Sequence, residues 1–188
     1  MSDEKFNMKL GQLGEAISLC AGKNLIEPTL MLLYSAIDIC GWLANDDPNA
    51  GVRKCFVAWT DRYMEPEKHL DCTADDLYGA RCGLVHMLSP DSDHNKKGKA
   101  RLIAYAWGSG NAAKLNQVYQ KAGKSKLIVA VHIHDLRKTW SEGVLKFTAE
   151  LDKDPQWAKR VYQRAAQFFV DLEAGNDGKI KKQKDPNK

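Results

Sequence analysis

One apolar segment, Thr29 to Ala44, constrains the fold more than any other part of the chain. It follows Pro28, which suits the first turn of a helix, and it ends before the turn-forming residues NDDPNAG. Its only charged residue is Asp38. Because apolar side chains would lie on every side of this helix, we expect it at the centre of a bundle, surrounded by other helices.

Periodic apolar residues predict further helices. In the stretch from Val52 to Met64, for example, Phe56, Trp59 and Tyr63 fall on one stripe. Short connections between the first four helices indicate an antiparallel four-helix bundle. The predicted helices of the bundle span Phe6–Cys20, Thr29–Ala44, Val52–Met64 and Thr73–Leu88, and two more span Asp135–Leu151 and Pro155–Leu172.

A different pattern follows the fourth helix. The runs ARLIAYAW and KLIVAVHIH are rich in strand-forming residues, and the helix-like stretch NAAKLNQVYQKAG separates them. We therefore expect a mainly α protein with a small two-stranded β insertion. Residues 1–174 would form one domain, with the bundle at about 6–90 and the insertion and C-terminal helices at about 100–173, followed by a disordered basic tail at 175–188.

The charge of the chain is concentrated in that tail. Lysine and arginine number 28 against 24 acidic residues, a net charge of +4. The last ten residues, Lys179 to Lys188, carry five lysines and one aspartate, which accounts for the whole excess. The neutral body does not support a globally basic nucleic-acid-binding surface.

The cysteines and the N-terminus indicate the cellular compartment in which we expect the protein. Five cysteines are an odd number without a C-x-x-C pair, and Cys40, Cys55 and Cys82 fall in helix-like segments, where reduced cysteines are usually buried. The N-terminus has no apolar signal region, and the run from Leu30 to Ala44 is too short to span a bilayer. We expect a soluble cytoplasmic protein that does not interact with membranes.

An arginine in the fourth helix raises the question of function. Thr73 is its expected N-cap, with Asp75 and Asp76 in the first turn. On a helical wheel of about 100° per residue, Arg81 lies near the middle of the apolar arc. Because arginine stays charged, it needs an anion or a water-filled cleft. It could pair with Asp38 across two core helices, or it could hold an anionic ligand such as a phosphate.

The opposite arc of this helix carries Gly79 and Gly83, which lower its helix propensity by about 1 kcal/mol each. Such a stripe indicates close approach by another backbone, either within the bundle or from a second subunit. His86 would lie about 140° from Arg81 around the helix axis. A lone histidine at this position is more often a partner of the helix dipole than a catalyst.

Two sequence motifs, which contain Asp38, Arg81 and His86, resemble those of a known family. The fourth helix reads D-L-Y-x-x-R-x-x-L-V-H, and the apolar helix before it contains L-L-Y-S-A-I-D. Together they resemble the HEPN (higher eukaryotes and prokaryotes nucleotide-binding) domains, whose signature is an arginine followed, after four to six residues, by a histidine. Arg81 and His86 match this signature, Leu77 and Tyr78 fit its usual context, and the resemblance covers Glu27 to Pro90.

The resemblance implies a metal-independent endoribonuclease, without cofactor, in which two subunits bring their motif helices together around one cleft. His86 would be the acid or base, and Arg81 would hold the scissile phosphate. Asp38 and Tyr78 would support them, whereas Cys82 stands where active members often have a polar residue. RNA, a second copy and a protein inhibitor are the implied partners, in bacterial or phage defence or a toxin–antitoxin system. Since many relatives do not catalyse, the alternative is a non-catalytic nucleotide- or protein-binding module.

Three further motifs remain open. HIHD, from His132 to Asp135, would place two histidines on one face of a strand, as a metal site or, more simply, as a solvent-facing edge. WGSGN, from Trp107 to Asn111, could offer backbone amides to a phosphate or form an ordinary turn with an Asn cap. A basic cluster after the motif helix could contact an RNA backbone or form a solvated loop; it consists of Lys96, Lys97, Lys99 and Arg101.

Overall fold

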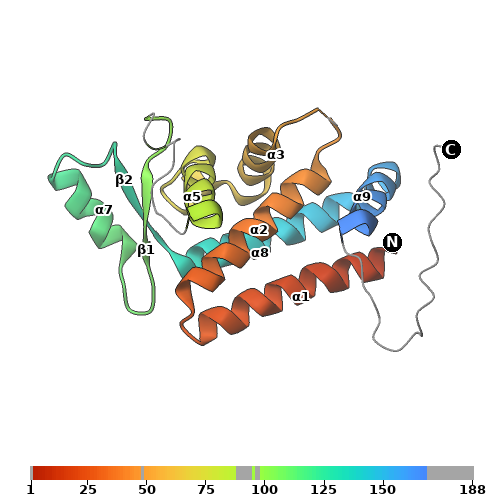
Figure 1. Cartoon of the computed structure of the whole chain (residues 1–188), viewed down its shortest axis with the longest axis horizontal. Coiled ribbons are helices and arrows are strands. Elements are labelled where there is room, and N and C mark those ends of the chain that lie inside the picture. Colours follow the sequence, from red (N-terminus) through yellow and green to blue (C-terminus); the bar gives the residue numbers. More distant parts are fainter. Residues whose placement is uncertain (1, 48, 88–94, 96–97, 169–188) are drawn as a thin grey trace.

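The protein is mainly helical and carries a small parallel sheet of two strands, which confirms the expected fold class at this level (Figure 1). A computed structural model describes residues 2–47, 49–87, 95 and 98–168, so the expected tail at 175–188 lies outside it. The first elements are α1 (Asp3–Gly22), α2 (Ile26–Ala44), α3 (Val52–Trp59), η1 (Thr60–Met64), α4 (Pro66–His69) and α5 (Ala74–Met87). They are followed by β1 (Leu102–Ala106), α7 (Ala112–Lys121), β2 (Ile128–His132), α8 (Ile133–Leu151) and α9 (Pro155–Phe168).

Helix α2 lies at the centre, as its apolar sequence predicts. It contacts α1, α3, α5, α8 and α9, and side chains such as Leu33 and Ile37 are fully buried. The helix begins at Ile26 rather than Thr29 and is 19 residues long. By length and composition the whole helix could cross a membrane, whereas the expectation concerned only the shorter run from Leu30 to Ala44. Half of its apolar window is buried inside the protein, as in the core helix of a bundle.

The predicted helix from Val52 to Met64 changes its geometry part-way. After α3 the chain continues as the π-helical turn η1, which closes with a hydrogen bond from the Glu65 amide to the Thr60 carbonyl oxygen (3.1 Å). Glu65 is left-handed at φ 46°, and the short helix α4 follows with Pro66 as its first residue. The wider turn lets the consecutive residues Tyr63 and Met64 both be buried, which a helical stripe does not predict.

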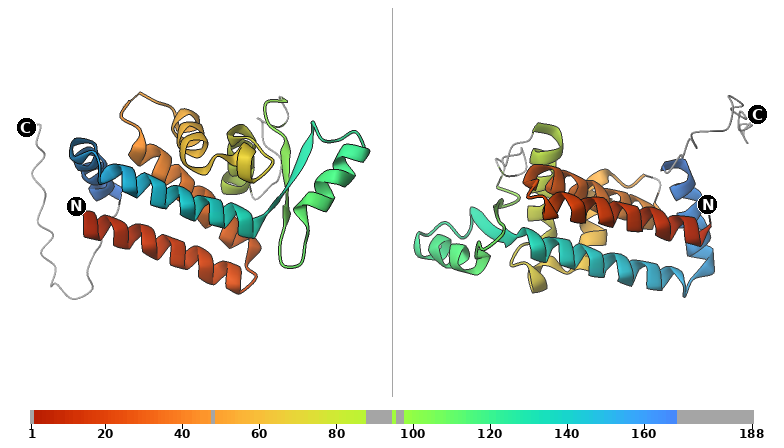
Figure 2. Two further views of the ribbon diagram at one scale, coloured as in Figure 1. Left: turned by 180° about the vertical axis from the view of Figure 1, so that it is seen from behind. Right: turned by 90° about the horizontal axis from the view of Figure 1, so that it is seen from below.

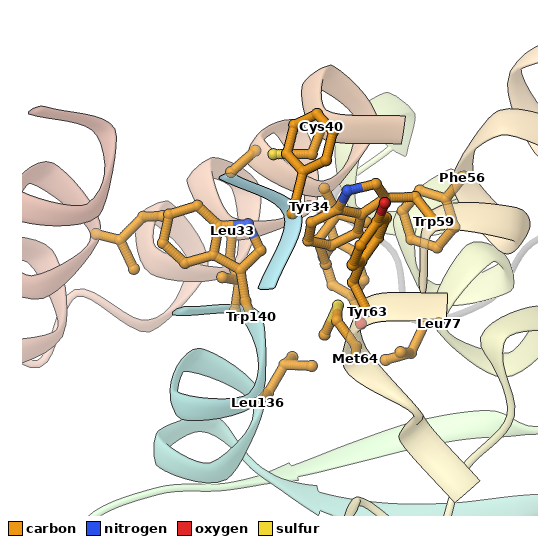
Figure 3. Close-up of a cluster of buried hydrophobic side chains, with 14 of the residues drawn as sticks. Leu33, Tyr34, Cys40, Phe56, Trp59, Tyr63, Met64, Leu77, Leu136 and Trp140 are labelled. Carbon is orange, nitrogen blue, oxygen red and sulfur yellow. The ribbon is translucent and has the colours of Figure 1, made fainter. Parts of the chain in front are cut away.

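Helix α8 closes the core from a second side. Leu136 and Trp140 point from it toward the side chains of α2 and η1 (Figure 3). Further along, a Cβ at Gly143 would lie 3.2 Å from the carbonyl oxygen of Tyr63, so the glycine permits α8 to pack directly on η1. The expected C-terminal helices thus form part of the core.

The β insertion is a strand–helix–strand unit. β1 and β2 pair in parallel, with Leu102 opposite Ile128, and α7 connects them. Asn111 caps α7 by accepting a hydrogen bond from the Lys114 amide (2.9 Å), as the Asn-cap interpretation of WGSGN predicts. α7 then covers β2, where the Asn116 side-chain amide hydrogen-bonds both backbone groups of Ala130 (2.6 and 3.1 Å). This contact blocks the outer edge of β2 at its middle residue.

The expectation for HIHD is wrong. β2 ends at His132, and His134 already belongs to the first turn of α8, so the two histidines do not share one face of a strand. Instead, His132 is the N-cap of α8, and its Nδ1 accepts a hydrogen bond from the His134 amide (3.2 Å). Within the described residues, no group of three or more His, Cys, Asp or Glu side chains is arranged to hold a metal ion.

Candidate functional site

The N-terminus of α5 is tied to the start of β1 by one buried carboxylate. Asp76 accepts a hydrogen bond from the Thr73 amide (2.9 Å), while the Thr73 hydroxyl accepts one from the Asp76 amide (3.1 Å), which confirms Thr73 as the cap. Asp76 also accepts three hydrogen bonds from Arg101: one from its amide (2.6 Å), one from Nε (3.0 Å) and one from Nη2 (2.7 Å). We call this group, Thr73, Asp76 and Arg101, the clamp.

The clamp decides where Arg101 points. Its guanidinium donates to Asp76 and to the carbonyl oxygen of Asp71 (3.0 Å), so this member of the expected basic cluster is engaged within the protein. Lys99 is exposed and lines a hollow with the carboxylates Asp61 and Asp75, an acidic setting for an RNA backbone. Lys96 and Lys97 lie outside the described residues. The structure thus brings no basic surface together from Lys99 and Arg101.

Arg81 pairs with Asp38, as one of the two sequence interpretations requires. Its Nε donates to Asp38 Oδ2 at 2.6 Å, joining the middle of α5 to α2. Burial lowers the pKa of the Arg81 guanidinium, but the hydrogen bonds and charge interactions with Asp38 and Cys82 together raise it by more, so the guanidinium stays charged. The side chains remain 15% and 20% exposed, so the pair lies at the edge of the core, where solvent can reach it.

Tyr78 and Cys82 lie beside the pair. The Tyr78 ring packs edge-on against Phe56 with centroids 5.5 Å apart. Burial raises the pKa of the Tyr78 hydroxyl, and a hydrogen bond with the Cys82 side chain adds to this effect. Cys82 is half-buried, whereas Cys40 and Cys55 are buried as expected for helix cysteines. Both supporting residues therefore adjoin the Arg81–Asp38 pair.

His86 lies in the last turn of α5, one residue before its end. The structure describes the helix backbone there but not the histidine side chain. On this helix His86 follows Arg81 by five residues, as the motif requires. Its direction relative to Arg81 stays a prediction from the helical wheel.

Gly79 has a close neighbour within its own chain. A Cβ at this position would lie 3.0 Å from the Cβ of Ala100 and 3.4 Å from the side-chain amide nitrogen of Asn95. That amide in turn donates to the backbone carbonyls of Ala100 (3.2 Å) and Arg101 (2.9 Å). The glycine therefore lets the segment leading into β1 pack on α5, a reason for its presence that involves no second subunit.

A buried tyrosine pair was not predicted from the sequence. The hydroxyls of Tyr34 on α2 and Tyr105 on β1 are 2.6 Å apart. Burial raises the pKa of both hydroxyls, so both are neutral at physiological pH and one donates to the other. The only sequence signal was a tyrosine at a core position of each element, and a buried tyrosine needs a partner for its hydroxyl.

The chain was compared with protein-family models, curated proteins and solved structures. The chain matches no family model, no curated protein and no solved structure. The resemblance to HEPN domains therefore depends on the two sequence strings and on the geometry of the residues in them.

Proposed function

We propose that this protein is an HEPN-like, metal-independent endoribonuclease whose site contains Arg81 and His86. In this proposal α1, α2, α3 and α5 correspond to the HEPN-like four-helix bundle. The observation that carries it is the ion pair between Arg81 and Asp38. This pair joins the two helices that bear the HEPN-like strings and holds the motif arginine at a place that solvent reaches.

The proposed reaction uses the RNA's own 2′-hydroxyl. His86 takes the proton from this hydroxyl, whose oxygen then attacks the adjacent phosphorus, and the bond to the 5′-oxygen breaks. The protonated His86 then gives this proton to the departing 5′-oxygen, leaving a 2′,3′-cyclic phosphate and a 5′-hydroxyl end. Arg81 binds the phosphate and stabilises its developing charge, while Asp38 keeps the guanidinium oriented.

A second candidate is a non-catalytic nucleotide- or protein-binding module. The same ion pair favours it, because Asp38 by itself supplies the anion that a largely buried arginine requires. The two candidates differ in what the loss of His86 would change. In the module, the histidine has no chemical role.

Cleavage of a mixed RNA pool in EDTA tests the enzyme directly. The wild-type protein should produce 2′,3′-cyclic phosphate ends, and His86→Ala should produce none. Arg81→Lys, which keeps a cation beside Asp38, should lower the rate by about 100-fold, the usual loss when a donor to a developing oxyanion is misplaced. The matched control is His69→Ala, which removes an exposed histidine from α4 and should cleave like wild type.

Two results would contradict the enzyme. Equal cleavage by wild type and His86→Ala would mean that a contaminating nuclease or another site is responsible. No cleavage of any RNA in the pool, by a protein with an intact helical spectrum, would favour the binding module. For the two-subunit cleft, light scattering should show a dimer at the concentrations at which cleavage occurs.

A further inference from the structure

Two motifs that the proposed nuclease does not use meet at one cavity. Trp107 and Gly108 of WGSGN follow β1, and in HIHD His132 ends β2 while His134 lies just after it. Because the strands are parallel, their carboxyl ends lie at the same edge of the sheet. A cavity of about 90 Å³ opens there, and the α1–α2 turn at Asn24 closes it from the side of the bundle.

The two connections at this edge leave the sheet in different directions. From the strands, α7 and α8 extend in opposite directions, which both views of Figure 2 show. The connections β1–α7 and β2–α8 therefore diverge at the carboxyl ends of two adjacent parallel strands. In open α/β sheets, ligands bind in the crevice at such a point.

The lining of the cavity carries hydrogen-bond donors and one permanent positive charge. Among the residues that the structure describes, it includes His132, His134 and Arg137 but no aspartate or glutamate. The His132 Nδ1 accepts a backbone hydrogen bond, so the neutral ring carries its proton on Nε2 and can donate from there. Arg137 is oriented by a hydrogen bond from its Nη2 to the Ser18 hydroxyl of α1 (3.0 Å).

These three side chains have no carboxylate partner among the residues that the structure describes. The pairs formed by Arg101 and Arg160, by contrast, show how the protein neutralises its other arginines. An unneutralised arginine beside two imidazoles in a concave site attracts an anion. The volume of about 90 Å³ exceeds what a single water molecule needs and leaves room for a tetrahedral oxyanion.

An exposed aromatic ring narrows the class of ligand. Trp107 lines the same cavity, yet 54% of its surface is exposed, so it makes little contribution to the core. Indole rings in such positions stack on nucleobases in a sequence-tolerant way. A base on Trp107 and a phosphate beside Arg137 would belong to one small molecule.

We propose that this cavity binds the phosphate of a nucleotide, with the base stacked on Trp107. Arg137, His132 and His134 supply the donors to the phosphate oxygens. The site lies on different elements from Arg81 and His86, so it does not depend on the proposed nuclease. It would make the β insertion the nucleotide-binding part of the protein.

Calorimetric titration of the full chain with adenosine 5′-monophosphate tests this site. Saturable binding is expected, whereas adenosine, which lacks the phosphate, should bind at least about tenfold more weakly, the usual loss when a charged hydrogen-bonding group is removed. Ribose 5-phosphate and inorganic phosphate should bind more weakly than the nucleotide, because they cannot stack. A 5′-phosphorylated DNA trinucleotide distinguishes a free nucleotide from the end of a chain.

Two substitutions separate the parts of the ligand. Arg137→Gln should weaken nucleotide and inorganic phosphate alike by about tenfold, since it removes one charge-assisted contact. Trp107→Ala should weaken only the nucleotide, by about fivefold or more. The matched control is Arg53→Gln, which changes an exposed arginine on α3 and should bind like wild type. Circular dichroism and thermal melting confirm that each variant is folded.

The outcomes are decisive in either direction. No nucleotide binding at millimolar concentration would overturn the site, as would equal affinity for adenosine and its monophosphate. Binding that survives Arg137→Gln but disappears in Arg81→Lys would place the nucleotide at the proposed nuclease site instead. Loss of RNA cleavage in His86→Ala with unchanged nucleotide binding would show that the two sites are separate.

Discussion

Two arginine–aspartate pairs anchor the same helix, and they differ in exposure. In the clamp, the Asp76 side chain is 3% exposed and accepts four hydrogen bonds, from Thr73 and Arg101. The Asp38–Arg81 pair is 20% and 15% exposed and lies beside the half-buried Tyr78 and Cys82. The first carboxylate is inaccessible and belongs to the architecture. The second pair can meet a ligand, which is why the proposed function is placed there.

Removing the clamp carboxylate should have the largest effect on stability. Asp76→Ala leaves the Arg101 guanidinium without its carboxylate partner and removes the acceptor for the Thr73 amide at the start of α5. We expect the free energy of unfolding to fall by about 3–5 kcal/mol, as for a broken buried ion pair. Urea denaturation followed by circular dichroism measures this change. A loss below that of the Asp38 substitution would reverse the ranking of the two pairs.

Breaking the Asp38–Arg81 pair should cost less stability, and a second substitution should restore most of the loss. Asp38→Ala should lower the free energy of unfolding by about 2–3 kcal/mol, because solvent at the edge of the core screens the remaining Arg81 charge. The double variant Asp38→Ala, Arg81→Met removes the uncompensated charge and should regain most of that loss. If the double variant is as unstable as the single one, the pair is not what couples α5 to α2.

The hydrogen bond between the two neutral tyrosines should have an intermediate effect on the free energy of unfolding. Tyr34→Phe removes one hydroxyl of the buried tyrosine pair between α2 and β1, and should cost about 1–1.5 kcal/mol. Tyr105→Phe should cost a similar amount, and the double variant less than the sum of the two. Full additivity in this double-mutant cycle would mean that the hydroxyls do not interact.

An exposed ion pair between the first turn of α5 and α3 should have the smallest effect on stability. Asp75 meets Arg53 with side chains 35% and 49% exposed, one residue before Asp76. Asp75→Ala should change the free energy of unfolding by only about 0.5 kcal/mol, through the helix dipole and a screened ion pair. It is the matched control for Asp76→Ala, and a comparable loss from both would show that position in the first turn matters more than burial.

Local patterns were enough to predict most elements. The central place of α2 followed from apolar residues on all its sides. The strand–helix–strand order of the insertion followed from two runs of strand-forming residues, which a helix-like stretch with an asparagine cap separates. The failures have local causes as well. The π-turn at Thr60 to Met64 and the left-handed Glu65 break the helical period, and His132 ends a strand while capping the next helix.

The candidate site was predictable only in part. From the sequence, Arg81 needed an anion and Asp38 was the best internal candidate, and the structure joins them. Arg101 looked equally available for RNA, but the fold engages it with Asp76. Its sequence neighbours gave no sign of this, because the partner comes from a helix 25 residues earlier.

The sequence by itself determined most of the helices and strands, since caps, turns and periodicity act over a few residues. Only the tertiary structure decided which charges neutralise one another and which motifs share a cavity. Trp107 and His132 are 25 positions apart, and each has an ordinary local explanation. They line one cavity because they lie at the ends of two strands that run in parallel, and that pairing depends on packing across the whole fold.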